Sequence, residues 1–352
     1  MSYTHNQAQS QKRQPNLADI AAKAEVSVTT VSRILAGKKL NTFPLTTIER
    51  VRSIAGELRY RPNRLVRGMQ TGQTGLVGVV MSPQGSFYGA VLAGIHDELI
   101  SEDRLPVVIW SEVDSPRGRG RSELEQIHSL VDLRVEGVIL RPVFYEASDV
   151  YFQEILERKI PLVSVDRALP KANCGFVGSD DESGMAAILD HLKTLGHSRI
   201  CFFGPDTAVS TGLHRLHSFR FLTSQDRTMA PVEYLLSHWN PTEEDALSCL
   251  GKVPKQSAII AVNDSFAALI YKAAAIKKIR IPEDISVVGY GNLDFSPLMH
   301  PPLTTVDQHP YDIGVSAARS LHLRMMNPTE RVSKILHPCD LVVRESTAPA
   351  PR

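Results

Sequence analysis

Few residues in this chain have the types and spacing that catalysis or metal binding requires. The sequence has no HExxH, GxSxG or Walker A motif, and no GxGxxG in a suitable context. His214 and His217 lie three residues apart, which would place a possible metal pair on one helical face. Because the spacing indicates no third ligand, satisfied or surface histidines are the favoured interpretation. The sequence therefore predicts a protein that is not an enzyme and has no metal or cofactor.

The cysteines and the apolar pattern indicate the compartment. The four cysteines are scattered without a CxxC pair, which is typical of reduced, buried thiols. They are Cys174, Cys201, Cys249 and Cys339. Residues 1–14 are polar and lack the apolar segment of a secretory signal, and no apolar run reaches the roughly 18 residues of a membrane span. We expect a cytoplasmic protein with no membrane partner.

The charge of the chain is unevenly distributed. Residues 1–67 contain twelve Lys and Arg against four Asp and Glu, a net charge of +8, although the whole chain carries only +1. The remainder is therefore mildly acidic, at −7. A small basic segment on an acidic body indicates a segment that binds a polyanion. The alternative is a solvated basic surface with no partner.

The basic segment has the pattern of three short helices. Apolar residues at helical spacing predict helices over about 17–24, 28–35 and 45–58. Ser27 is a candidate N-cap for the second helix, and Gly37 stands where a left-handed C-terminal cap belongs. Pro44 fits the first turn of the third helix.

From Leu76 onward, short apolar runs alternate with amphipathic stretches. Strands are expected at 76–81, 106–110, 137–142, 161–166, 174–180, 199–204, 257–263 and 285–291. Helices are expected between them, for example at 88–103, 120–134, 182–195, 242–250 and 264–278. This alternation predicts buried parallel sheets with helices on both faces. Because about 275 residues are long for one such sheet, we expect two lobes with a ligand cleft between them, at the carboxyl ends of the strands.

The 352 residues, 43% hydrophobic and 22% charged, are an ordinary globular composition for two or three domains. The expected organisation is a flexible tail (1–15), a basic helical domain (16–61), a linker segment (62–74), a large α/β domain (75–345) and a short tail (346–352). Within the large domain, the first lobe is expected at about 75–177 and 309–336, and the second at about 178–308 and 337–345.

Two segments carry a family resemblance. Residues 16–38, NLADIAAKAEVSVTTVSRILAGK, followed by residues 58–69, LRYRPNRLVRGM, resemble the DNA-binding head and hinge of the LacI/GalR family. The resemblance continues to about residue 345. It implies an all-α helix-turn-helix head (16–61) and a hinge helix with a linker (62–74). It also implies an α/β, two-lobed effector-binding and dimerisation domain (75–345) that is similar to periplasmic binding proteins.

In such a head the second helix lies in the major groove and its N-terminal residues contact bases. The resemblance assigns base contacts to Val28, Thr29 and Arg33. Arg33 has the geometry to bind guanine through two hydrogen bonds, and Val28 can contact a thymine methyl group. Ser27, Thr30 and Ser32 are expected to contact phosphates. The alternative for Val28 and Thr29 is that they only begin a helix.

The hinge would become helical on DNA and enter the minor groove as a pair in the dimer. Tyr60, Asn63, Arg64 and Met69 are the expected DNA-binding residues there. Met69 stands where family members have the Leu that opens the central base step, and Gly68 before it weakens the helix by about 1 kcal/mol relative to Ala. The alternative is that Met69 packs on the core.

The head departs from the family in two places. Glu25 occupies a turn position that is usually Gly, which would cost about 1 kcal/mol if a positive φ is required there. The loop from Lys38 to Thr42 is about two residues longer than in the best-known members, and Lys38 and Lys39 could add phosphate contacts.

In the body, the resemblance implies that charged, amide and aromatic side chains bind a small sugar-like effector. The expected effector-binding residues are Phe87, Asp166, Arg215, Trp239, Asn263, Gly291 and Asn292. The alternatives are that Arg215 pairs with an acid on its own helix, that Asp166 caps a helix and that Trp239 belongs to the core.

One departure bears on the effector. After Gly289 and Tyr290 the family usually has an Asp that accepts hydrogen bonds from sugar hydroxyls, whereas this chain has Gly291. The missing carboxylate weakens the case for a plain neutral hexose and leaves open an acidic effector held by Arg215. Arg141 follows the apolar residues GVIL at the end of a predicted strand and could also contribute.

These observations together predict a dimeric, allosteric transcriptional regulator, and we expect it to act as a repressor. It would bind a near-palindromic operator in double-stranded DNA under the control of a small effector. The alternatives are a cytoplasmic sugar-binding receptor that does not recognise DNA, and a sugar-processing enzyme, for which no nucleophile or acid–base pair is evident. The salt dependence of DNA binding would discriminate between them, being steep only for the first.

Overall fold

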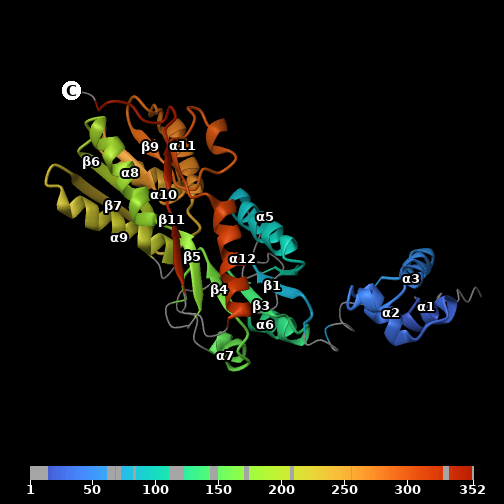
Figure 1. The fold of residues 1–352 in the computed structure, drawn as a ribbon. Helices are drawn as coiled ribbons and strands as arrows, with labels where there is room; N and C mark the ends of the chain where they lie inside the picture. The colour runs from blue at the N-terminus through green and yellow to red at the C-terminus, as the bar shows by residue number, and fades with distance from the viewer. Residues whose placement is uncertain are drawn as a thin grey trace, which may run out of the picture. The chain divides into compact units, whose positions relative to one another are not determined.

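The computed structural model describes residues 15–61, 68, 73–81, 85–110, 123–142, 150–169, 174–206, 210–254, 256–327 and 333–350. The chain divides into two compact units, residues 1–74 and residues 75–352. We describe each unit by itself (Figure 1).

The first unit is helical, as the sequence predicts. It consists of α1 (Leu17–Ala24), α2 (Val28–Leu35), the short 3-10 helix η1 (Leu40–Thr42) and α3 (Leu45–Glu57). The buried apolar residues of the three α-helices form one core, made of Ile20, Ala21, Ala24, Val31, Ile34, Ile48, Val51, Ile54 and Ala55. A capping box fixes the start of α1, because the Asn16 side chain accepts hydrogen bonds from the N–H groups of Ala18 and Asp19 while Asp19 accepts one from the N–H of Asn16.

The second unit contains two parallel sheets, each in its own lobe. Sheet A has the order β11-β5-β4-β3-β1-β2. Its strands are β1 (Leu76–Val80), β2 (Leu105–Ile109), β3 (Gly137–Leu140), β4 (Leu162–Val165), β5 (Gly175–Ser179) and β11 (Lys334–His337). Together with α5 (Gly85–Ser101), α6 (Glu123–Asp132), α7 (Val150–Glu157) and α12 (Pro310–Met326), sheet A forms the first lobe. Helices α5 and α12 pack together, as do α6 and α7.

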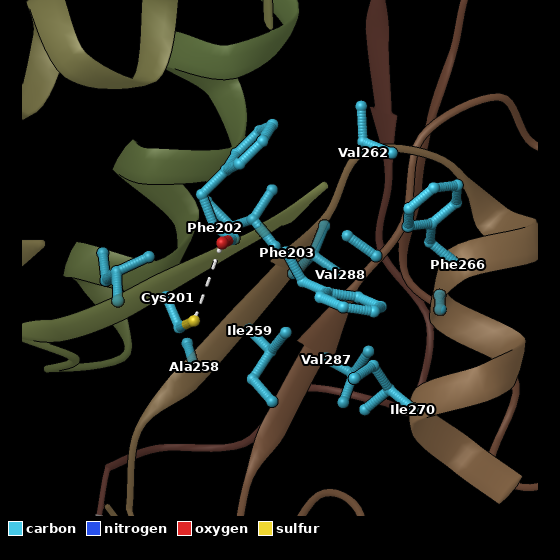
Figure 2. Close-up of a cluster of buried hydrophobic side chains, with 14 of the residues drawn as sticks. Cys201, Phe202, Phe203, Ala258, Ile259, Val262, Phe266, Ile270, Val287 and Val288 are labelled. Carbon is cyan, nitrogen blue, oxygen red and sulfur yellow. Dashed lines mark hydrogen bonds between the residues drawn. The ribbon is translucent and has the colours of Figure 1, made fainter. Parts of the chain in front are cut away.

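Sheet B forms the second lobe and has the order β7-β6-β8-β9. Its strands are β6 (Arg199–Pro205), β7 (Ala230–Leu236), β8 (Ala258–Ala261) and β9 (Ser286–Val288), and its helices are α8 (Asp181–Thr194), α9 (Ser210–Gln225), α10 (Glu243–Lys252) and α11 (Asp264–Lys277). The crossovers reverse direction after β7, which places α9 on one face and α10 and α11 on the other. Phe203 of β6 therefore packs on Phe266 of α11, with 5.5 Å between ring centroids, while the neighbouring Phe202 points to the other face and packs on Phe219 of α9, also at 5.5 Å (Figure 2).

The chain passes between the two lobes three times. It leaves sheet A after β5, returns between β10 (Thr305–Asp307) and α12, and leaves again after β11 to form β12 (Asp340–Val342). Strands β10 and β12 pair with each other in antiparallel fashion. A further 3-10 helix, η2 (Ser296–Leu298), lies in the loop before β10.

The expected α/β architecture with two lobes and parallel sheets is confirmed, and every strand anticipated from the sequence is present, with bounds that differ by at most three residues. The elements without a predicted counterpart are α7, α9, α12, β7, β10, β11, β12 and the 3-10 helices η1 and η2. Strand β7 carries Pro231 and a mostly exposed surface, and it forms an edge of sheet B, where proline is tolerated. Its sequence therefore lacks the continuous apolar run by which the inner strands are identified.

Helices α5 and α12 approach so closely that only glycine fits at their contact. A Cβ atom on Gly94 would lie 2.1 Å from the carbonyl oxygen of Tyr311, and one on Gly314 would lie 2.1 Å from that of Val91. Both distances are far below van der Waals contact with backbone atoms. This packing holds the C-terminal helix α12 against the first helix of the lobe and so positions the first turn of α5, where Phe87 and Tyr88 lie.

Candidate functional sites

The first candidate site is the exposed face of α2. The helix begins where Ser27 predicts, because the Ser27 Oγ accepts a hydrogen bond from the N–H of Thr30 at 3.0 Å. It ends at a Schellman motif around Gly37, whose φ of 68° confirms the predicted left-handed cap; the N–H of Lys38 donates to the carbonyl of Arg33 at 2.9 Å.

These two caps fix which side chains α2 exposes. Val31 and Ile34 are buried in the core of the unit. Val28, with 46% of its surface exposed, and Thr29 and Arg33 face solvent. Thr29 and Arg33 are four residues apart and therefore lie on one face of the helix. Ser27 is exposed, and Thr30 and Ser32 are half-buried beside this face.

Of the hinge residues, the structure describes Tyr60 and Gly68. Tyr60 is half-buried against the core of the first unit, and burial raises the pKa of its hydroxyl. The predictions for Asn63, Arg64 and Met69 lie outside the described residues.

The two places where the head departs from the family sequence, the turn at Glu25 and the loop that begins at Lys38, both contain a residue with left-handed backbone conformation. Glu25 adopts φ 51° and ψ 45°, so the turn between α1 and α2 does require a left-handed residue and a non-glycine side chain occupies it. Lys39 also adopts a left-handed conformation, at φ 53°, and begins η1. Lys38 and Lys39 are both exposed.

The second candidate site begins in the first lobe, at the carboxyl ends of the sheet A strands. Asp166 follows β4 and Arg141 follows β3, while Tyr88 comes from the first turn of α5. The Tyr88 hydroxyl donates a hydrogen bond to Asp166 Oδ2 at 2.8 Å, and the Arg141 guanidinium lies 4.5 Å from the centre of the Tyr88 ring. Phe87 packs edge to face on Tyr88 with a centroid distance of 5.1 Å. We call Tyr88, Arg141, Asp166 and Arg167 the strand-end cluster.

Burial dominates the electrostatics of the strand-end cluster. Burial raises the pKa of Tyr88, and the Asp166 carboxylate raises it further while Arg141 and Arg167 lower it. Burial lowers the pKa of Arg167; Tyr88 and Asp166 oppose this decrease, and the positive charge of Arg141 adds to it. Tyr88 is therefore a neutral hydrogen-bond donor that fixes the orientation of Asp166.

The second lobe contributes Arg215 from α9. This side chain is 5% exposed, and its Nε donates to Asp181 Oδ1 at 3.0 Å while Nη1 donates to the Val262 carbonyl at 2.8 Å. Its guanidinium stacks on Tyr290, 3.8 Å from the ring centre. Burial by itself would lower the pKa of Arg215, but the Asp181 carboxylate reverses the effect and raises it above its usual value. The alternative that Arg215 pairs with an acid on its own helix is wrong, because Asp181 belongs to α8.

Two interactions join the first lobe to the second, one of them through the strand-end cluster. The negative charge of Asp166 contributes to the raised pKa of Arg215, so these groups from different lobes act on each other. The backbone N–H of Asp294 donates to the Ser86 Oγ of α5 at 3.3 Å. Asp166 and Arg215 are thus the two predicted effector residues that the structure brings within electrostatic reach across the lobes.

The other predicted effector residues of the second lobe have clear structural bonds. Asn263 caps α11, its Oδ1 accepting from the N–H of Phe266 at 3.0 Å. Asn292 donates to Asp307 at 2.9 Å and accepts from Arg344 at 2.7 Å. Gly291 has φ 126°, a conformation that excludes most side chains. Trp239 is half-buried, 6.1 Å from the Phe266 ring and against Gly212.

Four residues of these two clusters were not among the predicted site residues: Tyr88, Arg167, Asp181 and Tyr290. Asp181 follows the carboxyl end of β5, so the rule that selected Asp166 and Asn263 at strand ends would also have found it. No local pattern in the sequence indicates that Tyr290 contacts Arg215, because their stacking depends on how α9 packs in the lobe. Among the described residues, no group of three or more His, Cys, Asp or Glu side chains could hold a metal ion. His214 and His217 therefore have no third ligand among these residues. None of the described helices has the length and apolarity needed to cross a bilayer.

The first unit is helical and exposes one face of a helix that is capped at both ends. The second unit is α/β, with two lobes and with charged side chains at the carboxyl ends of its strands. Together they define a class of protein in which a ligand-binding domain follows a helix-turn-helix head. Comparison with known proteins agrees. Residues 16–63 match the family described as bacterial regulatory proteins, lacI family, and residues 189–347 match a periplasmic binding protein-like domain.

The relatives extend over almost the whole chain. It is 30% identical to the HTH-type transcriptional regulator reg1 of Streptomyces lividans, covering 95% of this chain and 97% of that protein. It is 28% identical to the HTH-type transcriptional regulator DegA of Bacillus subtilis, covering 94% and 97%. The chain therefore belongs to the LacI family of DNA-binding transcriptional regulators, which are not enzymes.

Solved structures show the same fold. A lac repressor dimer bound to operator and the anti-inducer ONPF matches with a TM-score of 0.82 at 24% identity, covering 96% of this chain and all of that one. A complex of the transcriptional regulator CelR with cellobiose matches with a TM-score of 0.64 at 25% identity, covering 94% and 99%.

Proposed function

We propose that this regulator binds a near-palindromic operator as a homodimer, with α2 of each protomer in the major groove. The observation that carries the proposal is the exposure of Val28, Thr29 and Arg33 on a helix whose opposite side is buried and whose two ends are capped. A rigid helix of this kind presents its N-terminal side chains to base edges.

The DNA-binding residues have different roles. Arg33 hydrogen-bonds a guanine, Thr29 donates or accepts a hydrogen bond, and Val28 contacts a thymine methyl group. Ser27, Thr30 and Ser32 contact phosphates, which orient the protein without selecting sequence. Tyr60, Asn63 and Arg64 belong to the hinge, and Met69 enters the minor groove as an apolar wedge.

Exposed apolar side chains of the first lobe support a homodimer. Four apolar side chains there are each 43–48% exposed: Ile100 in α5, Leu105 and Val108 in the edge strand β2, and Trp110 just after that strand. A related structure is a lac repressor dimer on its operator. A two-fold dimer would place two heads on the two half-sites of a palindrome.

The effector that we propose is a small sugar or sugar derivative bound between the lobes by Phe87, Asp166, Arg215, Trp239, Asn263, Gly291 and Asn292. Relatives support this class: a ribose operon repressor of Haemophilus influenzae is 25% identical to this chain, and the CelR structure contains cellobiose. The effector and the operator would change each other's affinity by the same factor. As a DNA-binding regulator the protein would act in the cytoplasm, in the first instance as a repressor.

Selection of binding sites from random duplex DNA with the full-length protein tests this proposal. We expect enrichment of a near-palindrome with half-sites about one helical turn apart, and a steep loss of affinity with salt. Enrichment that is absent even at low salt would overturn the proposal and return the interpretation of a sugar receptor that does not recognise DNA.

A further inference from the structure

The chain enters the first lobe at Gly75, the residue before β1. Gly75 adopts φ 69°, a left-handed conformation in which a residue with a side chain is strained. Both of its backbone polar groups are bonded, because its N–H donates to Glu136 Oε1 at 2.6 Å and its carbonyl accepts from the N–H of Leu105 at 2.8 Å. Residues that are distant in the sequence therefore fix the path of the backbone at this point.

Glu136 holds Gly75 while it is itself part of an ion pair. Its other oxygen, Oε2, accepts a hydrogen bond from Arg104 Nη1 at 2.6 Å, and the Arg104 and Glu136 side chains are only 15% and 18% exposed. Hydrogen bonds with an ionised partner are roughly twice as strong as those between neutral groups. We call Gly75, Arg104 and Glu136 the entry clamp.

The entry clamp lies at the amino ends of three neighbouring strands of sheet A. Gly75 precedes β1, Arg104 precedes β2 and Glu136 precedes β3, and β1 lies between the other two strands. Strand β3 then runs from Glu136 to Arg141 in the strand-end cluster, at the opposite edge of the sheet. The clamp thus makes the backbone at Gly75 move together with sheet A.

We propose that the entry clamp is a positioning device for DNA recognition. By fixing the backbone at Gly75, it restricts where the preceding head can bind, and so it sets the spacing between half-sites that a dimer accepts. Glu136 and Arg104 are then positioning residues that act on operator binding through the backbone. The inference rests on the proposed function in one respect, that two heads of a homodimer bind one near-palindrome. It goes further by assigning half-site spacing to residues of the α/β unit.

Glu136→Gln tests the clamp with little change in shape. The glutamine oxygen can accept from the Gly75 N–H, but its NH2 group would then face the Arg104 guanidinium, one donor against another. One of the two bonds must therefore be lost. Glu154→Gln is the matched control, because Glu154 also loses an arginine partner, Arg158, in the same lobe but in α7.

Hydrogen exchange of the Gly75 amide in the full chain measures the clamp itself. We expect exchange about tenfold faster in Glu136→Gln than in the wild type, because the bond to the carboxylate is weakened or lost. Glu154→Gln should leave it unchanged. Equal exchange in the wild type and Glu136→Gln would overturn the proposal, since Gly75 would then be held without the Glu136 carboxylate.

Duplexes of altered spacing measure what the clamp does. The probes are the duplex enriched by site selection and two derivatives with one base pair added or removed between the half-sites, which turns one half-site by about 35° relative to the other. The wild type and Glu154→Gln should bind the selected duplex about tenfold more tightly than either derivative, because a fixed entry fits one spacing. In Glu136→Gln this ratio should fall to about threefold or less, whereas affinity for a duplex of unrelated sequence should not change, because its phosphate contacts come from the head.

A second variant reaches the clamp through the backbone. Gly75→Ala, which places a side chain at φ 69°, should also weaken the spacing preference, whereas Gly89→Ala, where nothing lies within 4 Å, should not. A preference that survives in both Glu136→Gln and Gly75→Ala would overturn the proposal, as would a wild type that binds all three duplexes equally. Failure to select any palindrome would count against the proposed function instead, and hydrogen exchange at Gly75 would still decide whether Glu136 holds the entry.

Discussion

At the scale of single residues, the capped start of α2 makes Arg33 the sharpest test of DNA recognition. Arg33→Ala should weaken operator binding by about 1–3 kcal/mol and relax the preference at one base pair, because a bidentate guanine contact is lost. Site selection with the variant measures both effects. Arg50→Ala, an exposed arginine of α3, is the matched control and should not relax any position. Uniform weakening on all sequences would instead make Arg33 a phosphate contact.

The buried pair of Arg215 and Asp181 complicates a simple effector-site mutation. Arg215→Ala should abolish the effector response, but it leaves the Asp181 carboxylate buried without its partner, and such losses typically cost about 3–5 kcal/mol. Urea unfolding should therefore show a clear loss for Arg215→Ala. The double variant with Asp181→Asn should recover part of it, and additive losses would show that the pair does not interact in this way.

The left-handed Glu25 predicts a stabilising substitution. Glu25→Gly should stabilise the head by about 1 kcal/mol, because glycine adopts φ 51° without the steric penalty. Slower hydrogen exchange of α1 and α2 amides in the full chain would report it. Glu49→Gly inside α3 is the control and should have the opposite effect. Faster exchange in Glu25→Gly would mean that the Glu25 side chain contributes more than its backbone costs.

At the scale of elements, the contact between α5 and α12 requires glycine at position 94, whereas position 89 of α5 has room for a side chain. Gly94→Ala should destabilise the first lobe by about 1–3 kcal/mol, because its Cβ would meet the Tyr311 carbonyl oxygen at 2.1 Å. Gly89→Ala in the same helix meets nothing within 4 Å and should stabilise by up to about 1 kcal/mol. Thermal unfolding of the two variants should move in opposite directions; a shared direction would show that α5 and α12 separate easily.

The elements that sequence predicts well are those with local signals. Ser27 and Gly37 mark the ends of α2 within a few residues, and the inner strands are apolar on both faces. Strand β7, with Pro231 at a sheet edge, and the three-residue strands β10 and β12 have no such signal. In the site, strand ends identify Asp166 and Asn263. The partners of Arg215 come from α8 and from the loop after β9, so only the packed lobe brings them together.

At the scale of the whole molecule, the segment after β12 makes the second lobe sensitive to pH. His197 Nε2 donates to the Ala348 carbonyl at 3.0 Å, and His191 Nε2 lies 2.9 Å from Thr347 Oγ1. Burial lowers the pKa of both imidazoles, and the charge of His197 lowers that of His191 further. In His197 the hydrogen bond to Ala348 opposes the effect of burial, but burial is larger, so both imidazoles are held in their neutral forms beside the C-terminal segment.

Stability should therefore be complete above the unfolded histidine pKa of about 6.5 and should fall as the pH drops below it, because the unfolded chain then binds more protons. Thermal unfolding between pH 7.5 and 5.5 measures this slope. His197→Gln should flatten it, whereas His300→Gln, at an exposed position, should not. An unchanged slope in His197→Gln would assign the pH dependence to other groups.

The three passages between the lobes also determine the order in which this protein can fold as it is synthesised. The head is complete once residue 61 has emerged from the ribosome, and it needs nothing that follows for its core. The core of the first lobe includes Ile313, Ala317 and Leu321 of α12, and β11 completes its sheet still later. A nascent chain therefore has a folded DNA-binding head long before the lobe that is to regulate it can close around its own interior.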